Sequence, residues 1–151
     1  MTEYRVTVYG DPRPWQSQHR GSPRTPGFMA MQKYQLLIQV AIKEQLGNVE
    51  PLTGPVRLEI AFYRAHTGKH IPPEDPVKLQ AFNLKHIGVA PDLTNCLKAA
   101  EDALKGLLFV DDKQVIETHC SKGFDDEGEG KTVIRVSEIL SLAGQQWPPH
   151  F

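Results

Sequence analysis

The strongest constraint on the fold is a change in the period of the apolar residues between residues 3 and 63. Residues 3–9 alternate polar and apolar side chains, the pattern of a strand with one buried face. Residues 29–46 instead repeat apolar side chains every three or four positions, which predicts an amphipathic helix that ends at Gly47. Residues 55–63 return to alternation and predict a second strand.

The second half of the chain predicts one more helix and two more strands. Residues 94–105 have the pattern of a helix that is closed by Gly106, with Lys105 in its last turn. Residues 114–121 and 131–138 alternate as strands on either side of an acidic, glycine-rich turn. The order βαβαββ predicts an α+β fold, in which a mixed β-sheet is covered by two helices. We expect one domain over residues 1–140 and a tail over residues 141–151.

Two irregular segments carry basic residues. Residues 10–27 are rich in Pro and Gly, and residues 64–90 are a long segment without periodicity, which inside a compact domain is either functional or disordered. Each basic residue taken singly is also explained as ordinary solvated surface. Trp15 either stacks on a base or packs as a buried aromatic. The candidates for phosphate contacts are Arg13, His19, Arg20 and Arg24 in the first segment, and Lys69, His70, Lys78, Lys85 and His86 in the second.

The charge is distributed unevenly, although the net charge is only −1. Residues 1–90 hold 11 Lys and Arg against 7 Asp and Glu, whereas residues 91–151 hold 6 against 11. This asymmetry fits a basic surface for phosphates and an acidic region for a metal, and it equally fits a chance segregation of solvated charge.

The sequence shows neither a membrane-spanning segment nor a secretory signal, and its two cysteines do not form a zinc-binding motif. The chain has no apolar stretch long enough to cross a bilayer and no secretory pattern at its start, so we expect a cytoplasmic protein without a membrane partner. Cys96 and Cys120 are then expected as reduced thiols, and neither belongs to a C-x-x-C pair that would indicate zinc.

Acidic residues flank the second predicted helix. Hydrolysis of a phosphodiester is served by Mg²⁺ held by carboxylates from different segments. Asp92 precedes the helix, and Asp112 follows the apolar run 107–110. The helix rises about 18 Å, so the two carboxylates can converge if the apolar run turns back along it. An Asp before a helix is also a common cap, and Asp-Asp pairs commonly mark turns.

Residues 91–115 resemble the core signature of RusA-type crossover junction endodeoxyribonucleases, the Holliday-junction resolvases of that family. The signature runs Asp-x-Asp-Asn-Leu-x-Lys, then Asp-Ala-Leu, a bend that contains Gly, and Asp-Asp-x-Gln-Val. The resemblance extends outward over residues 5–138. The matching residues are Asp92, Asn95, Lys98, Asp102–Ala103–Leu104, Gly106, Asp111–Asp112 and Gln114–Val115.

The resemblance implies a site and a substrate. Asp92 and Asp112 would ligate Mg²⁺ or Mn²⁺, with Asp111 in a supporting role, and Lys98 would be the essential lysine that stabilises the scissile phosphate. Asn95 and Gly106 would be structural. The implied partner is branched DNA, above all the four-way junction. Because that junction needs two opposed nicks, a two-fold homodimer is expected. The implied setting is a phage or prophage and its bacterial host.

On the residues alone, Lys98 is also explained as a solvated helix lysine paired with Asp102. The departure from the signature is Thr94, where the family commonly has an aspartate. Threonine supplies a neutral oxygen, so metal affinity is expected to fall, and it can also cap the helix by accepting the N–H of Leu97. Two rivals to a resolvase stay open: a DNA-structure binder that lost cleavage through Thr94, and a nuclease that acts on flaps or forks.

Overall fold

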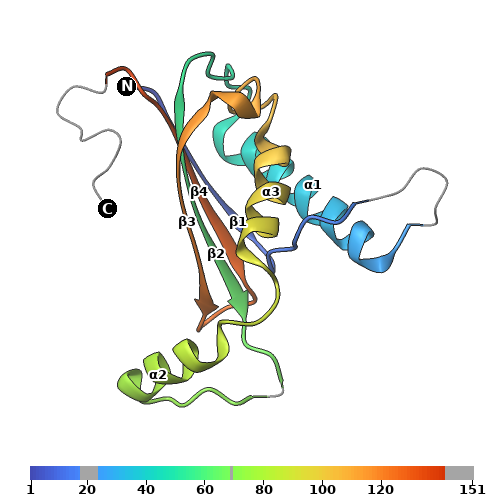
Figure 1. Cartoon of the computed structure of the whole chain (residues 1–151), viewed down its shortest axis with the longest axis vertical. Coiled ribbons are helices and arrows are strands. Elements are labelled where there is room, and N and C mark those ends of the chain that lie inside the picture. Colours follow the sequence, from blue (N-terminus) through green and yellow to red (C-terminus); the bar gives the residue numbers. More distant parts are fainter. Residues whose placement is uncertain (18–23, 69, 142–151) are drawn as a thin grey trace.

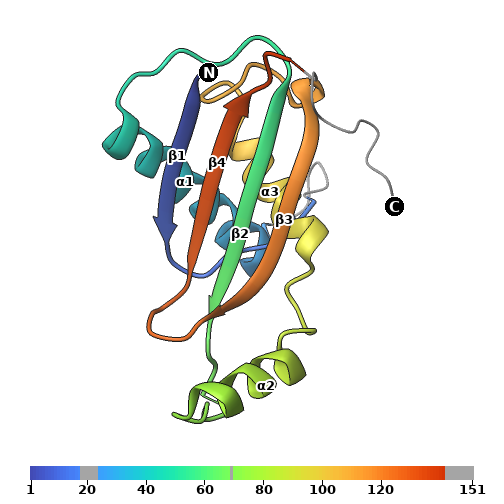
Figure 2. The ribbon, with the colours of Figure 1, turned by 90° about the vertical axis from the view of Figure 1, so that its left-hand side faces the viewer.

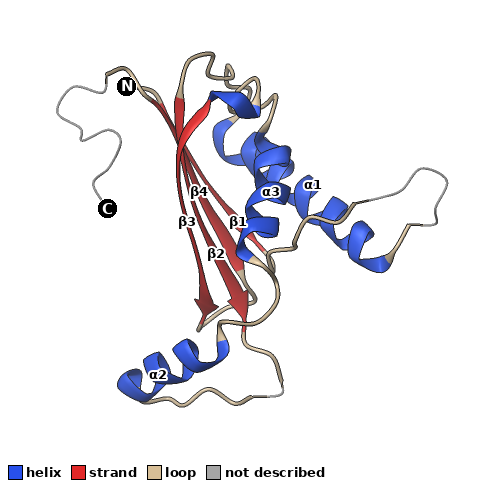
Figure 3. Cartoon of the chain, viewed as in Figure 1, coloured by secondary structure: helices blue, strands red, loops and turns tan. Residues whose placement is uncertain are grey.

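The structure is a computed structural model that describes residues 1–17, 24–68 and 70–141. It has the α+β architecture predicted from the sequence, as Figures 1 and 3 show. A short 3-10 turn, η1, lies between α3 and β3. The elements are β1 (Glu3–Tyr9), α1 (Pro26–Leu46), β2 (Val56–Ala65), α2 (Pro76–His86), α3 (Leu93–Leu104), η1 (Asp112–Gln114), β3 (Val115–Asp125) and β4 (Lys131–Glu138).

The four strands form one mixed sheet in the order β1-β4-β2-β3. β4 pairs antiparallel with both β1 and β2, whereas β2 and β3 pair in parallel. A parallel pair needs a crossover connection, and the segment that holds α2 and α3 supplies it. β1 and β3 are therefore the edge strands, and the mixed sheet predicted from the sequence is confirmed.

Helices α1 and α3 cover one face of the sheet, α1 over β1 and α3 over β3 (Figure 2). Ile38 of α1, Leu58 of β2, Ala100 of α3 and Ile134 of β4 have no exposed surface, so the core lies between the helices and this face. The other face carries mostly polar side chains, which alternate with the buried ones along β1, β2 and β4. No described helix covers it (Figure 2).

Local signals set the ends of α1. The Thr25 hydroxyl accepts a hydrogen bond from the Phe28 N–H at 3.1 Å, and Pro26 occupies the first turn. Because threonine caps and proline in the first turn both favour a helix start, α1 begins three residues before the predicted residue 29. Gly47 ends it with a φ of +71°, a conformation that favours glycine. Neither α1 nor any other helix in the described ranges is long and apolar enough to span a membrane.

The segment 64–90 contains a helix that periodicity does not reveal. Asp75 caps α2 by accepting hydrogen bonds from the N–H groups of Val77 and Lys78, both at 3.0 Å, and Pro76 follows it. None of the residues of α2 is buried, so the helix has no apolar face to predict it. It lies outside the helix layer, beyond the ends of β2 and β3 (Figure 1). The expectation of an irregular segment is thus wrong for residues 76–86.

Side chains beyond the ends of β2 and β3 hold α2 in place. The Asp126 carboxylate contacts His66 Nε2 at 2.7 Å and accepts a hydrogen bond from the Asn83 amide at 2.9 Å. His66 also stacks on Phe124, with ring centroids 4.3 Å apart. A few polar and aromatic contacts, rather than the core, therefore fix this helix.

Candidate active site

Asp92 is the cap of α3. Its backbone is extended, with φ −68° and ψ 131°, and its Oδ1 accepts a hydrogen bond from the Asn95 N–H at 3.1 Å. The helix consequently begins at Leu93, and Asp92 rather than Thr94 is the capping residue. Thr94 lies in the first turn with its side chain exposed. The interpretation of Thr94 as the cap is corrected, because the carboxylate of Asp92 already occupies that position.

Two basic side chains fix the segment that precedes Asp92. Lys122 of β3 donates hydrogen bonds from Nζ to the carbonyls of Val89 and Pro91, at 2.7 and 3.1 Å. Arg64 of β2 donates to the carbonyl of Ala90. Both cations therefore lie next to the N-terminal end of α3, where free N–H groups already carry partial positive charge. This end of the helix favours an anion such as a phosphate.

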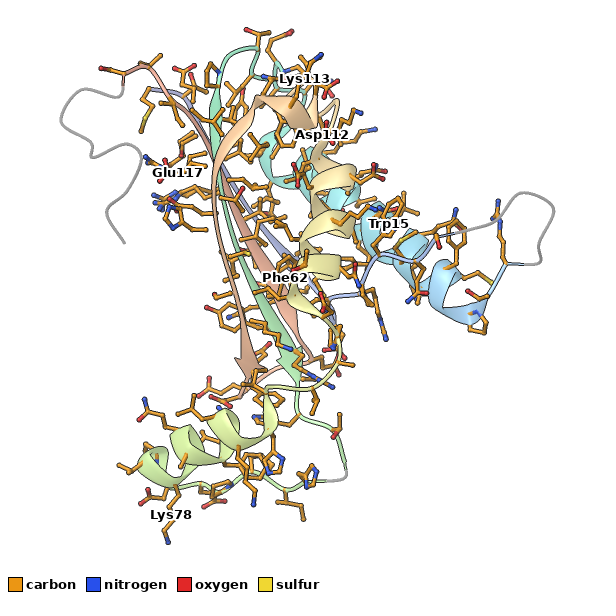
Figure 4. All side chains as sticks on the ribbon, in the orientation of Figure 1. Trp15, Phe62, Lys78, Asp112, Lys113 and Glu117 are labelled. Atoms are coloured by element: carbon orange, nitrogen blue, oxygen red, sulfur yellow. The ribbon has the colours of Figure 1, made fainter. Side chains whose placement is uncertain are left out.

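Asp111 and Asp112 lie in the turn that follows α3. Asp111 caps η1, with its carboxylate accepting a hydrogen bond from the Lys113 N–H at 3.1 Å. That backbone hydrogen bond, then a side-chain hydrogen bond with Asp112 and the nearby charge of Lys105, hold the pKa of Asp111 below its ordinary value. Asp111 thus has a structural task, whereas Asp112 is exposed at the start of η1 (Figure 4).

Gln114 anchors this acidic turn to the rest of the fold. Its Oε1 accepts hydrogen bonds from the N–H groups of Val110 and Asp111, both at 2.8 Å. Its Nε2 donates to the carbonyls of Leu52 and Gly54, at 2.8 and 2.9 Å. One side chain therefore joins the turn that carries Asp112 to the segment that leads into β2.

Within one chain, Asp92 and Asp112 do not converge. Asp92 precedes the first residue of a 12-residue helix, and a helix of that length rises about 18 Å. Asp112 lies beyond the other end, beside Glu101, whose pKa is raised by burial and by the charge of Asp112. The apolar run stays at this end of α3, because the N–H groups of Leu107 and Leu108 both donate hydrogen bonds to the carbonyl of Leu104 at 3.0 Å. Gly106, with a φ of +84°, closes the turn through its N–H to the Phe109 carbonyl at 2.7 Å.

Lys98 lies near the middle of α3 with an exposed side chain. Its Nζ is 4.7 Å from the ring centroid of Trp15, which lies beside α3 (Figure 4). The Asp102 carboxylate instead accepts a hydrogen bond from the Gln35 amide at 3.2 Å. Among the described residues Lys98 forms no ion pair. The alternative interpretation, in which Lys98 is paired with Asp102, is therefore wrong.

The predicted phosphate contacts lie on two separate parts of the fold. Arg13 is exposed in the segment after β1, and Arg24 donates to Gln32 at 3.4 Å near the start of α1. Lys85 and His86 lie in the last turn of α2, whose far end carries Lys78 (Figure 4). His19, Arg20 and Lys69 lie outside the described residues.

His86 is a weaker candidate for phosphate binding than its residue type suggests. Its ring stacks on His70, with centroids 4.3 Å apart. Partial burial and the charges of His70 and Lys85 lower its pKa, so less of it is protonated at neutral pH.

Sequence reasoning did not assign a role to Arg64, Lys122 or Gln114. For Lys122 a signal exists, because it pairs in register with the buried Phe62 and so extends the helix-covered face of β3. A lysine on such a face needs partners, and here backbone carbonyls provide them. For Arg64 the partner is distant in sequence and could not be read from spacing. For Gln114 a local signal exists, because Asp111 and Gln114 have the spacing of a capping box.

In the described part of the chain, no three His, Cys, Asp or Glu side chains form a group that could hold a metal ion. The carboxylates of Asp92 and Asp112 have no ion pair among the described residues. Their oxygens suit a hard cation by type. One chain alone does not assemble them into a site.

The chain is similar to the uncharacterized protein YqaN of Bacillus subtilis (strain 168), with 28% identity over 135 residues. The matched region covers 87% of this chain and 94% of YqaN. Residues 6–137 match the model of the endodeoxyribonuclease RusA family. This match runs from β1 into β4 and includes both ends of α3. The chain therefore belongs to the RusA family of endodeoxyribonucleases.

Proposed function

We propose that this protein resolves four-way DNA junctions by paired nicks, through metal-assisted hydrolysis that uses Asp92, Asp112 and Lys98. The nuclease class rests on membership of the RusA family. The observation that carries the proposed site is the placement of two exposed carboxylates at the two ends of α3, with Lys98 between them. None of the three forms an ion pair with another described residue.

A second copy of the chain would complete the site. A two-fold axis beside the middle of α3 would set two copies of this helix antiparallel. Asp92 of one protomer would then lie near Asp112 of the partner subunit, although the same residues are separated within each chain. The arrangement is accessible, because β3 is an edge strand and α3 covers it (Figure 2). Water and phosphate oxygens would supply the remaining ligands of Mg²⁺.

The dimer agrees with the proposed substrate. A two-fold axis generates two such sites, and a four-way junction with approximate two-fold symmetry has to be nicked at two opposed positions. Each protomer would contribute one carboxylate to each of the two sites.

The residues divide the chemistry between them. Asp92 and Asp112 would hold the cation, which when bound would supply Lewis-acid stabilisation of the phosphate and activation of the attacking water. The Lys98 ammonium, which no described carboxylate neutralises, would stabilise the charge that develops on the phosphate oxygens. The N-terminal end of α3, with Arg64 and Lys122, would attract the DNA backbone. We expect 5′-phosphate and 3′-hydroxyl ends.

The test is cleavage of a synthetic four-way junction with Mg²⁺, with Mn²⁺ and with EDTA, by the parent protein and by Asp92→Asn. Asparagine is the informative substitution, because it keeps the helix cap and removes only the charge. Symmetric nicks that need a metal and disappear in Asp92→Asn support the proposal.

Thr94 gives the non-catalytic alternative a specific basis, since this exposed position lacks the carboxylate that the family commonly has there. Tight junction binding without nicks under any metal would replace the resolvase with a DNA-structure binder. Faster cutting of a flap or fork than of the four-way junction would instead assign a nuclease with another preferred substrate.

A further inference from the structure

Trp15 is held by its backbone between two helices. Its N–H donates a hydrogen bond to the carbonyl of Asn95 on α3 at 2.9 Å. The N–H of the next residue, Gln16, contacts the sulfur of Met31 on α1 at 3.1 Å. The indole is half-buried. These contacts anchor the backbone of Trp15 to both helices, so the position of the residue beside α3 does not depend on Lys98.

The indole face provides an attraction for Lys98 that leaves its charge intact. The Lys98 ammonium lies 4.7 Å from the ring centroid, within the range of a cation–π interaction. The carboxylate one turn further along α3 belongs to Asp102, and Gln35 holds it through a 3.2 Å hydrogen bond. An ion pair with that carboxylate would neutralise the ammonium, whereas a neutral ring attracts the ammonium without cancelling its charge.

We infer that Trp15 is the positioning residue of Lys98: its ring holds the ammonium over α3, apart from the acidic side chains, so that the full charge is available to the scissile phosphate. This inference rests on the proposed function, because it takes Lys98 as the group that meets the phosphate. Trp15 itself need not touch the DNA. The aromatic face, rather than the bulk of the residue, is the required property.

Cleavage by two variants separates these properties. Trp15→Phe keeps an aromatic face and Trp15→Leu keeps only apolar volume. With saturating junction, single-turnover cleavage by Trp15→Leu should fall by about 10- to 100-fold, because a misplaced group can cost on the order of 100-fold in rate. Trp15→Phe should stay within about 3-fold of the parent, since phenylalanine is a weaker but competent cation–π partner. Equal rates for the two variants would overturn the inference.

A double-mutant cycle tests whether Trp15 acts through Lys98. In a Lys98→Gln background, Trp15→Leu should lower the rate by less than about 2-fold, because the interaction is already absent. A full additional loss in that background would show that Trp15 acts by another route. The junction Kd measured in EDTA should be unchanged in Trp15→Leu. A weakened Kd in both backgrounds would assign the ring to stacking on a base and would overturn the inference.

Fluorescence gives a readout that does not depend on cleavage. Trp147, the second tryptophan, lies outside the described residues, and a Trp147→Phe background leaves Trp15 as the single reporter. Iodide quenches an indole more strongly beside a positive charge, whereas neutral acrylamide does not respond to charge. The ratio of iodide to acrylamide quenching should therefore fall in Lys98→Gln and persist in Lys98→Arg. An unchanged quenching ratio in Lys98→Gln would show that the Lys98 ammonium does not lie beside the indole of Trp15, and it would overturn the inference.

Failure of the inference and failure of the proposed function remain distinguishable. If Lys98→Gln cleaves as fast as the parent, Lys98 does not stabilise the scissile phosphate, and the positioning role of Trp15 is overturned as well. The Asp92→Asn test would still decide whether the chain is a metal-dependent nuclease. If Lys98→Gln abolishes cleavage and the two Trp15 variants are equally active, only the inference is lost.

Discussion

Asp92 caps the first turn of α3, and Asp112 lies in the turn beyond the last residue of the same helix. A straight 12-residue helix separates them. The helix keeps the two carboxylates of one chain apart. In the proposed dimer, two antiparallel copies of α3 would place Asp92 of one protomer near Asp112 of the partner subunit. A site that uses both carboxylates, as proposed, would therefore need a second copy of the chain.

Complementation between two inactive variants tests the shared site. Asp92→Asn and Asp112→Asn homodimers should each cleave a four-way junction on the order of 100-fold more slowly than the parent, because each loses a charge needed in the transition state. A heterodimer of the two variants should recover nicking at one position. In that heterodimer, one site retains Asp92 from one protomer and Asp112 from the other.

The control for complementation is a heterodimer, with two different tags, in which both protomers carry Asp92→Asn. It should remain inactive. If the mixed heterodimer is equally inactive although it assembles, each site is built from a single chain and the two-fold arrangement is wrong.

Thr94→Asp should lower the Mg²⁺ concentration for half-maximal cleavage, because it returns a carboxylate to the first turn of α3 close to Asp92. An acidic residue near a helix N-terminus also stabilises the helix by about 0.3–1 kcal/mol. Metal titration of the cleavage rate is the measurement. Thr94→Asn is the matched control, since it adds a similar side chain without charge. Identical metal dependence in both variants would leave Thr94 without a part in the site.

Gln114→Ala should lower the free energy of unfolding by about 2–3 kcal/mol, because four hydrogen bonds of a half-buried side chain are lost. Cleavage should fall as well, since the turn that carries Asp112 loses its anchor. Urea unfolding and junction cleavage measure the two effects. The adjacent exposed Lys113→Ala should change stability by at most about 0.5 kcal/mol. A similar loss in both variants would argue against the anchor.

Asp126 predicts a pH dependence for the attachment of α2. Its hydrogen bond with His66, and then that with Asn83, lower its pKa below 3.8. A lowered folded-state pKa stabilises the fold above the unfolded value, and this contribution is lost as the pH falls through the folded value. Asp126→Asn should therefore be less stable than the parent at neutral pH. The difference should shrink as the pH falls below 3.8 and vanish below the lowered folded-state pKa.

Urea unfolding at several pH values, with proteolysis within residues 76–86 as a local probe, checks the Asp126 prediction. Glu127→Gln serves as the neighbouring control, because Glu127 is exposed. A stability difference for Asp126→Asn that does not change with pH would exclude the ionised carboxylate as its source.

The regular elements followed from the sequence where the alternation or the helical period continues to their ends. Strands 3–9 and 131–138 agree with Glu3–Tyr9 and Lys131–Glu138, because every second side chain in them faces the core. Helix α2 was missed, since a helix without buried residues has no period to detect. The pair Asp75–Pro76, a capping residue followed by proline, was the available signal.

The site was less accessible to sequence reasoning than the fold. The acidic residues were identifiable as types, but their separation depends on the path of residues 105–110. Leu108 and Phe109 on that path are fully buried, and the backbone of Leu52, which is distant in sequence, pairs with both of them. The contact of Trp15 with Lys98 joins two segments more than 80 positions apart, and no local pattern relates them.

Because α2 has no buried side chains, we expect its local free energy of opening to be lower than that of the central strands. Amides in residues 76–86 should exchange hydrogen with solvent through local opening, long before those of Ile60 or Ile134 in the central strands. Local opening of α2 should therefore leave the sheet that supports α3 folded.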